Sequence, residues 1–585
     1  MTINEDRPTL IVGIDFGTTF SGVAWGLQDC PDSIELIQTW PGGGNTTSQK
    51  VPTLCSYKDK RLRWGYQTDL LGTPGTQPHL IRGVKLLLDD SQQFRYAPAV
   101  DSQGIIKDLN MTPMEVAGDY LGELVSHARQ ILKRRFGSAM GTMDLQYILT
   151  VPAVWSDKGK DTTMRAALRA GVLPNTLTLL SEPEAAAVCA IRTIQPNSIA
   201  RDDCIIVCDA GGGTVDIITY RVKQTEPFRV EEATKGTGAL CGSVMLDERF
   251  DALIKKHVEN SSGQALPDGP ARTARQYWQD YVKPSYSGPP DEDDFCEMGY
   301  WIPLPGVSGI SNVDQSKGYL YLETDQVLDI FDPIMTEIEY LVAGQKESVE
   351  KAGYTTKAIV LVGGLGASAY LFKRLQAAFS GIEIMQPQNA WSAVARGAVI
   401  RGQEGNQVES RIARSSYGIK HWVMYDPNQH TYDEETVKWC PLAEKWHKHE
   451  KMSWHIRKGE SIAETKPIKM NFFYELDISH SLVILNDLYF CLQPTAPEWK
   501  DHSTYPMAST FAARPSLTSE GVTKLCRVEA DLSRIPKELF EKRTNSKGQH
   551  YYHIDYELVL TPASASLLFE LHFNGVSYGS VKSRY

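Results

Sequence analysis

Two segments of the chain combine an aspartate with a turn of glycine and threonine, a set of residues suited to binding phosphate. IVGIDFGTTFSGVAW (Ile11–Trp25) and IIVCDAGGGTVDIITY (Ile205–Tyr220) share one plan, in which an apolar strand ends in Asp15 or Asp209 and a turn follows. Glycine allows positive φ angles and close backbone approach, so successive N–H groups can point at phosphate oxygens. A carboxylate beside each turn can hold Mg²⁺ through its waters. The duplicated pattern therefore predicts two facing turns that bind one triphosphate from both sides.

The strand that follows each turn separates these hairpins, at Asp15–Thr19 and Asp209–Thr214, from other phosphate motifs. In a P-loop or a dinucleotide fingerprint, the glycine turn opens a helix. Here the alternating SGVAW and the β-branched VDIIT predict return strands. An ordinary tight turn is the alternative for either hairpin alone, but it does not explain the pair.

A third glycine motif offers a different interpretation of the chain. In IVLVGGLGASAYLF (Ile359–Phe372) a strand, glycines and a helix follow one another, and Gly364-x-Gly366-x-x-Ala369 resembles the dinucleotide fingerprint. Glu383 lies near the distance expected of a ribose-binding acid. A single fingerprint is weak evidence, however, and a dinucleotide site would leave both hairpins unexplained.

The elements that must position these motifs form an α/β pattern over residues 10–400, where short β-rich runs alternate with helical ones. One helix is predicted from about Met114 to Phe136, because apolar residues recur on one face. Thr112 can cap its start, and Gly137 can end it.

The periodicity of the sequence changes after the α/β region. Residues 403–414 are polar and without period, which predicts a linker. Residues 415–585 show the alternation of β-strands, as at Ile554, Tyr556 and Leu558, and no long helical pattern follows the last strand.

Composition limits the class of protein. The 585 residues are 42% hydrophobic and 22% charged, which is typical of a folded chain of two or three domains. The formal net charge of −11 argues against a general binder of nucleic acid or anionic membranes. No signal peptide or apolar run of ~20 residues is seen, and ten cysteines are too few for a disulfide scaffold. We therefore expect a cytoplasmic or nuclear protein.

Taken in order, the motifs resemble those of the heat shock protein 70 family, in its divergent eukaryotic branch. The resemblance covers about 400 residues and includes IDFGTTFSGVA, LTVPAVWSDKGKDTTMRAALRAG, LLSEPEAAA, DAGGGTVDI, LVGGLGAS and AVARGAVIRG. It implies an α/β actin-like ATPase domain at 1–402, with two lobes and duplicated ribonuclease H-like subdomains. It also implies a β-sandwich peptide-binding domain at 415–585.

The same resemblance implies ATP or ADP with Mg²⁺ as the cofactor, and it assigns roles residue by residue. The implied catalytic residues are Lys85, Glu182 and Thr214, and the implied metal-side residues are Asp15 and Asp209. The implied nucleotide-binding residues are Gly17, Thr18, Thr19, Gly211, Gly212, Gly213, Asp280, Lys283, Ser287, Gly363, Gly364 and Gly366. Asp216 ranks lower, as a polar residue of the return strand.

Simpler explanations stand beside several of these roles. Glu182 could belong to a helix start, because Ser181 and Glu184 have the spacing of a capping box. Lys85 could be a solvated surface lysine. Pro284 stands where the family has an arginine that stacks on adenine, which puts tight adenine binding in doubt.

Two other groups of residues favour structural interpretations. One pair shares one face of a strand and is expected to be buried: Cys204 and Cys208. Another group has the chemistry of metal ligands but is expected to form a solvated loop: Cys440, His447, His449 and His455.

The C-terminal part departs from the family pattern. VESRIAR replaces the usual leucine-rich linker, and the helical lid and acidic tail of the family are expected to be absent. The resemblance then implies a weak Mg²⁺-dependent ATPase that acts as a chaperone on unfolded or extended polypeptide clients, with co-chaperones and a nucleotide-exchange factor as further partners. A non-hydrolysing, nucleotide-gated adaptor and a small-molecule kinase of the actin-like superfamily are the alternatives, and no nucleic acid or membrane partner is expected.

Overall fold

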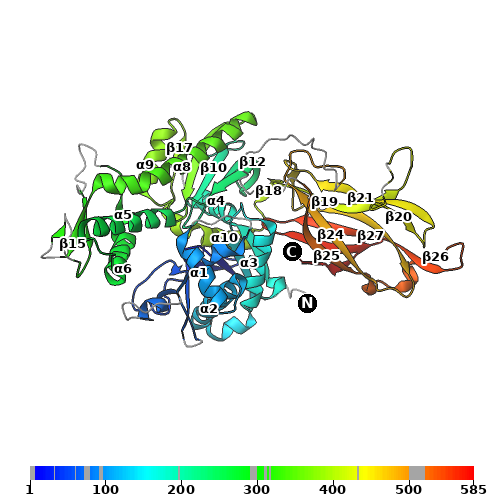
Figure 1. The fold of residues 1–585 in the computed structure, drawn as a ribbon, viewed down its shortest axis with the longest axis horizontal. Coiled ribbons are helices and arrows are strands. Elements are labelled where there is room, and N and C mark those ends of the chain that lie inside the picture. The colour runs from blue at the N-terminus through cyan, green and yellow to red at the C-terminus, as the bar shows by residue number, and fades with distance from the viewer. Residues whose placement is uncertain are drawn as a thin grey trace. The chain divides into compact units, whose positions relative to one another are not determined.

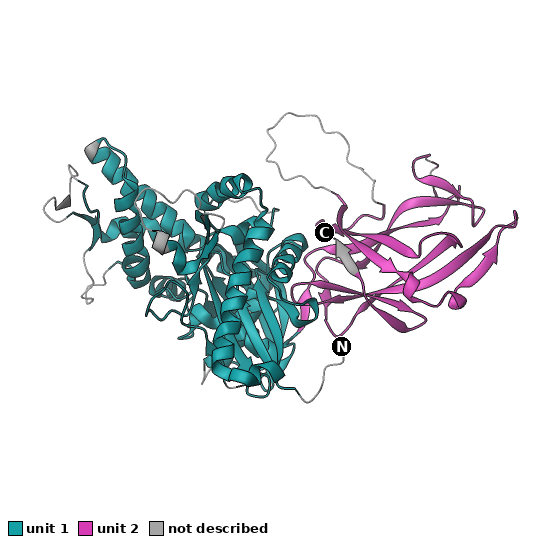
Figure 2. Cartoon of the chain, turned by 90° about the horizontal axis from the view of Figure 1, so that it is seen from below, with its two compact units in different colours: residues 1–408 teal, residues 409–585 magenta. Residues whose placement is uncertain are grey.

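The chain divides into two compact units, Met1–Val408 (unit 1) and Glu409–Tyr585 (unit 2), which Figure 2 shows in separate colours. The boundary falls inside the segment predicted as a linker, where a short strand, β18 (Val408–Ile412), forms and pairs with β22 (Ser461–Ile462). The computed structural model describes residues 7–31, 33–58, 61–71, 80–90, 96–194, 198–289, 299–307, 313–314, 318–430, 432, 434–499 and 521–584.

The first sheet of unit 1 has the strand order β3-β2-β1-β8-β9, and β4 also pairs with β2. β1 and β2 are antiparallel neighbours, whereas β8 and β9 continue the sheet in parallel. The strands are β1 (Thr9–Asp15), β2 (Phe20–Leu27), β3 (Glu35–Leu36), β4 (Val51–Pro52), β8 (Asp144–Val151) and β9 (Leu177–Ser181).

Five neighbouring strands of the second sheet repeat this topology, in the order β12-β11-β10-β16-β17, and Figure 1 labels β10, β12 and β17 among them. Again the first hairpin is antiparallel and the two following strands are parallel to its first strand. The strands are β10 (Cys204–Ala210), β11 (Val215–Gln224), β12 (Arg229–Ala239), β16 (Thr356–Val362) and β17 (Glu383–Met385). The duplication predicted from the two motifs therefore extends to five strands of each sheet.

Helices cover these sheets and build two cores. Helix α2 has the predicted limits, since Thr112 and Glu115 form a capping box and Gly137, at φ 58°, ends it. Further short strands form two small sheets, β6-β5-β7 and β13-β15-β14. The helices are α1 (Ala97–Asp108), α2 (Pro113–Phe136), α3 (Asp157–Arg169), α4 (Glu182–Thr193), α5 (Val244–Ser262), α6 (Asp268–Tyr277), α7 (Lys283–Ser285), α8 (Thr324–Lys351), α9 (Ala369–Ala378) and α10 (Ala393–Glu404). The short strands are β5 (Leu54–Lys58), β6 (Arg61–Trp64), β7 (Leu80–Arg82), β13 (Gly299–Pro303), β14 (Val313–Asp314) and β15 (Tyr319–Glu323).

One core joins the two sheets of unit 1 through helices α4 and α10. It contains Ile11 of the first sheet, Ile205 and Val360 of the second, and a run of alanines from both helices. Small side chains let the helices approach closely, so the strand ends that carry Asp15 and Asp209 are held on a common support. The predicted burial of Cys204 and Cys208 is confirmed, because both are fully buried in β10.

Unit 2 consists of two antiparallel sheets that share one hydrophobic core. Ile419, Ile484 and Val528 come from the first sheet, and Ile554 and Phe569 from the second. The first sheet contains β20 (Val437–Cys440), β21 (Lys445–Ile456), β19 (Ser416–Met424), β24 (Val483–Cys491), β25 (Thr523–Asp531) and β30 (Lys582–Arg584). The second contains β23 (Ile468–Asp477), β26 (Glu541–Thr544), β27 (His550–Pro562), β28 (Leu567–Phe573) and β29 (Val576–Ser580).

One local prediction in unit 2 was wrong. The charged segment around Cys440 and His447 is not a loop but the hairpin of β20 and β21, with Trp439 opposite Trp446. The strand was hidden because charged residues, such as Lys448 and Lys451, fall on both faces of β21, and because the polar His447 is buried and stacks on Trp422. Among the helices that the structure describes, none combines the length and apolar character needed to cross a membrane.

Candidate functional site

The turns of the two predicted hairpins lie against each other. A Cβ atom added to Gly212 would lie 2.3 Å from Thr19 Oγ1, and one added to Gly213 would lie 2.6 Å from Thr18 Oγ1. These distances are too short for any side chain, so the glycines are required by the contact itself. The prediction that the two turns face each other is confirmed.

Strand pairing fixes the position of each aspartate. Asp15 ends β1 opposite Gly22 of β2, and Asp209 lies opposite Asp216 in the β10–β11 ladder. The second turn is closed by the Gly211 N–H, which donates to the Thr214 carbonyl at 2.9 Å. Both aspartates therefore project from rigid strand ends and not from free loops.

Four carboxylates are buried in this region: those of Asp15, Asp209, Asp216 and Glu182. Burial raises the pKa of Asp209 well above its usual range, and the nearby charges of Glu182, Asp216 and Asp15 add to this shift. Burial also raises the pKa of Glu182 to about 7, although the Lys85 ammonium opposes the shift. The carboxylates repel one another when ionised, so each makes its neighbours harder to ionise. A cation bound among them offsets this repulsion.

Two lysines partly neutralise the cluster. Lys85 Nζ lies 2.5 Å from Glu182 Oε1, and Lys50 Nζ lies 2.6 Å from Asp15 Oδ2. Lys85 sits in the 3₁₀ turn η2 (Val84–Leu88), only 3% exposed, with its ammonium 5.7 Å from the ring centre of Trp155. It is therefore not the solvated surface lysine of the simpler explanation.

Glu182 is the first residue of α4, directly after β9. The capping alternative is not formed, because the side chain of the N-cap residue Ser181 accepts no bond from the first turn of the helix. The carboxylate of Glu182 instead pairs with Lys85, which arrives from a distant part of the chain. Lys85 and Glu182, which the resemblance implies are both catalytic, are therefore in direct contact.

The third glycine motif abuts the second hairpin. Gly363 has a φ of 86°, and a Cβ there would lie 2.5 Å from Asp209 Oδ1. The N–H groups of Leu365 and Gly366 donate to the Ala210 carbonyl at 2.9 and 3.0 Å, so they are not directed at a pyrophosphate. Glu383 accepts a bond from Ser198 at 2.7 Å. These contacts disfavour the dinucleotide interpretation and make the motif part of the same site.

The predicted adenine-binding residues are only partly brought together. Lys283 Nζ bonds Asp247 Oδ1 at 2.8 Å, and the same oxygen accepts a bond from Trp278 Nε1 at 2.9 Å. Asp280 is exposed and Ser287 half-buried, and among the described residues Asp280 forms no ion pair with Lys283. The π-helical segment Trp278–Val282 sets this arrangement, because the Lys283 N–H donates to the carbonyl five residues earlier.

Sequence reasoning missed two charged residues of the site. Lys50 belongs to no motif and is brought to Asp15 by the pairing of β4 with β2. Asp216, which ranked lower in the sequence analysis, is 1% exposed, and its Oδ1 accepts the Val154 N–H at 3.2 Å. Its position opposite Asp209 in a hairpin is the signal that could have found it.

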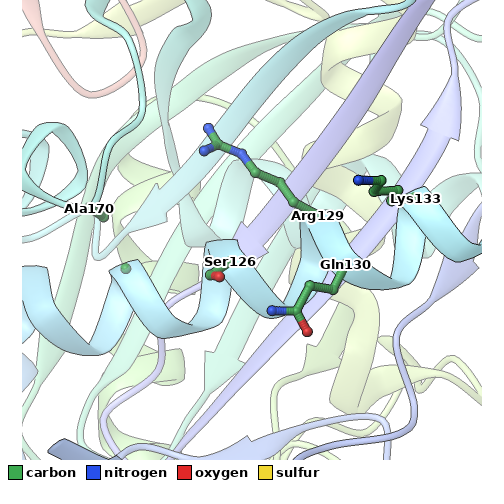
Figure 3. Close-up of a pocket in the computed structure, with 6 residues that line it drawn as sticks. Ser126, Arg129, Gln130, Lys133 and Ala170 are labelled. Atoms are coloured by element: carbon green, nitrogen blue, oxygen red, sulfur yellow. The ribbon is translucent and has the colours of Figure 1, made fainter. Parts of the chain in front are cut away.

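A pocket elsewhere on unit 1 is unrelated to these residues. It lies on helix α2, where Ser126, Arg129, Gln130 and Lys133 line it together with Ala170 (Figure 3). Arg129 is already engaged, since it donates to the Tyr147 hydroxyl and the Gly171 carbonyl. None of the predicted site residues lines this pocket.

A duplicated sheet topology, two facing glycine turns and an aspartate at each turn fit the predicted ATPase domain of the actin-like class. Comparison with known proteins agrees with this class. A family model described as Hsp70 protein matches residues 92–266, and a second, described as a domain of unknown function (DUF8568), matches residues 411–584.

Several characterised proteins are similar to the chain. Human heat shock 70 kDa protein 12A is 24% identical over 528 residues, which cover 75% of this chain and 76% of that protein. Human heat shock 70 kDa protein 12B is 23% identical over 519 residues, or 74% of each chain. A chaperone protein HscA homolog of Acinetobacter baumannii is 29% identical over 262 residues, 42% of this chain and 37% of its own. These matches support the predicted resemblance of the chain to divergent members of the heat shock protein 70 family.

Proposed function

We propose that this protein binds ATP with Mg²⁺ between its two hairpins, hydrolyses it slowly, and acts as a chaperone for extended polypeptide. The observation that carries the proposal is the buried pair of Lys85 and Glu182 beside two facing phosphate turns. The match to the Hsp70 protein model supports nucleotide binding, and the similarity to a chaperone protein HscA homolog supports the chaperone role.

The residues present fit the proposed cofactor. Asp15 and Asp209 are buried hard oxygen donors of the kind that hold Mg²⁺ through its waters. When bound, Mg²⁺ supplies positive charge that offsets the phosphate oxygens and the buried carboxylates.

Each protein group then has a defined task in hydrolysis. Hydroxyl and N–H donors of the two turns, with Thr214, hold the terminal phosphate, and Lys85 neutralises charge that develops on it. Glu182 orients the attacking water, and its pKa of about 7 suits a group that accepts a proton near neutral pH. No covalent intermediate with the protein is required.

Unit 2 supplies the proposed client site. We infer that its two antiparallel sheets form a β-sandwich that binds an extended peptide through backbone hydrogen bonds, with pockets for side chains. The two lobes proposed for unit 1 would close around ATP and relax after hydrolysis. The nine described cysteines are all free, which suits the reducing cytoplasm or nucleus.

A non-hydrolysing adaptor is the second candidate. Lys283 is bonded to Asp247 rather than to Asp280, and Pro284 cannot stack on adenine as an arginine does. A weaker adenine clamp favours a protein that senses nucleotide without turning it over.

Single-turnover hydrolysis of ATP by the full chain separates these candidates. Lys85→Ala and Glu182→Ala are each expected to slow hydrolysis about 10²- to 10³-fold, in line with the loss of a group that stabilises transition-state charge. The exposed Lys107→Ala, on helix α1, is the matched control and should retain the wild-type rate. Equal rates in all variants would exclude the catalytic assignment, whereas tight ATP binding without hydrolysis by the wild type would favour the adaptor.

A further inference from the structure

Lys50 is held in the phosphate region by contacts on its side chain and on its backbone. Its Nζ lies 2.6 Å from Asp15 Oδ2, and the residue is 6% exposed. Its carbonyl accepts bonds from Ser48 Oγ at 2.7 Å and from the Tyr66 hydroxyl at 3.3 Å. The ammonium is therefore positioned by the fold and is not a flexible surface charge.

The fold also makes room for the lysine stem. A Cβ added to Gly22 would lie 3.2 Å from Lys50 Cγ and 3.5 Å from Lys50 Cε, so the stem lies directly on the backbone of β2. Gly22 is the strand partner of Asp15. The stem thus follows the hairpin itself and delivers its charge to the end of β1.

The ammonium of Lys50 offsets part of the negative charge around the two turns. Four buried carboxylates surround the turns, and two ammonium groups face them, those of Lys85 and Lys50. Lys85 is bonded to Glu182, so Lys50 is the protein cation at the metal-side aspartate. A triphosphate adds further negative charge, which must be offset at short range.

The geometry of an ammonium group allows it to bridge. It has three N–H donors, and among the described residues Asp15 Oδ2 receives one of them. The other two are available to donate to phosphate oxygens. Charge-assisted bonds of this kind are about twice as strong as neutral ones.

We propose that Lys50 is a resident cation of the phosphate site, and that it lets the protein bind a nucleoside diphosphate or triphosphate without a divalent metal ion. This inference rests on the proposed nucleotide binding and goes beyond it, since it changes what the site requires of the metal. Asp15 then serves as the anchor of Lys50 when metal is absent.

Calorimetric titration of the full chain with ADP, in Mg²⁺ and in EDTA, tests the proposal, and the readout is the ratio of the two dissociation constants. ADP avoids turnover during the titration. For the wild type we expect this ratio to stay within about tenfold. Lys50→Met should raise it about 100-fold, the effect of losing one or two hydrogen bonds to a charged group.

Matched variants isolate the role of the charge. Lys50→Arg keeps a cation and should keep part of the metal-free binding. Lys85→Met removes the other buried ammonium, which does not contact Asp15, and should weaken binding in both media while the ratio stays constant. Thermal melting followed by circular dichroism checks that each variant is folded. If Lys50→Met does not fold, Gly22→Val replaces it as the deciding variant. The valine side chain displaces the Lys50 stem, so this variant should also raise the ratio of the dissociation constants.

Two results would overturn the inference. One is a wild-type dissociation constant for ADP that rises more than about 100-fold when EDTA replaces Mg²⁺. The other is a ratio that stays at the wild-type value in Lys50→Met, or in Gly22→Val where Lys50→Met does not fold. Either result leaves the proposed function intact if ADP binds in Mg²⁺. If the wild type binds ADP in neither medium, the proposed function fails and the inference fails with it.

Discussion

At the scale of single residues, burial of a charged group is visible outside the site as well. Asp161 lies in α3 and is 8% exposed, and burial raises its pKa to about 6 although Arg165 opposes the shift. The folded state therefore holds this proton between about pH 3.8 and 6, where the unfolded state has released it. Stability falls as pH rises through that window, because the folded state binds more protons.

Asp161→Asn should remove this slope. We expect the variant to gain about 1 to 2 kcal/mol relative to the wild type between pH 4 and pH 7, after allowance for partial solvent contact. Urea denaturation at several pH values measures the difference. Parallel pH profiles for the two proteins would contradict the assigned burial.

The sequence identified residues whose role is local and missed those whose role depends on pairing. Asp15 and Asp209 could be predicted because each follows its own strand and precedes its own turn. Lys50 could not, because only the pairing of β4 with β2 brings it to Asp15. Lys283 was predicted to bind nucleotide from its spacing, but its bond to Asp247 could not be predicted, because Asp247 lies in another helix that no local pattern relates to it.

At the scale of elements, the contact of α4 with α10 is set by one glycine. A Cβ added to Gly397 would lie 1.8 Å from the Ala185 carbonyl oxygen, which is backbone and cannot turn aside. Gly397→Ala should therefore separate the helices and cost about 1 to 3 kcal/mol or more through overpacking. Since these helices support both aspartate-bearing strands, ADP binding should weaken as well.

The chain offers a control of opposite sign. Gly344 is exposed on α8, and no described atom lies within 4 Å of a Cβ added there. Gly344→Ala should stabilise the protein by about 0.5 to 1 kcal/mol through helix propensity. Chemical denaturation of both variants tests the pair, and equal effects would show that the two helices have room to move apart at little cost.

Helix limits were predicted well where the apolar periodicity and the capping residues agree. They were predicted poorly where contacts with distant parts of the chain set the local backbone. Helix α2 carries both signals and has the expected limits. The π-helical turn before Lys283 has no such signal in the sequence. Pro284 explains the irregular turn, because proline lacks an N–H and crowds the carbonyl four residues earlier. This explanation is available only once the helix is known.

At the scale of the whole molecule, the two units have separate cores, so each should unfold in its own transition. Ligands stabilise only the unit that binds them, by about 2.7 kcal/mol when the ligand is at 100 times its dissociation constant. We expect scanning calorimetry of the full chain to show two transitions and ADP to raise only that of unit 1. The same experiment reports whether nucleotide reaches unit 2, because a shift in both transitions would mean that the units are energetically coupled.

A core variant assigns the transitions. Ile554 is buried among residues of both sheets in unit 2, and Ile554→Ala should destabilise that unit by about 2 to 5 kcal/mol. Only the transition that ADP does not move should then fall in temperature. If Ile554→Ala lowers the ADP-sensitive transition, the division into independently unfolding units is wrong. If ADP raises both transitions in the wild type, the replaced linker still couples nucleotide to unit 2, and the chaperone cycle gains support over the adaptor.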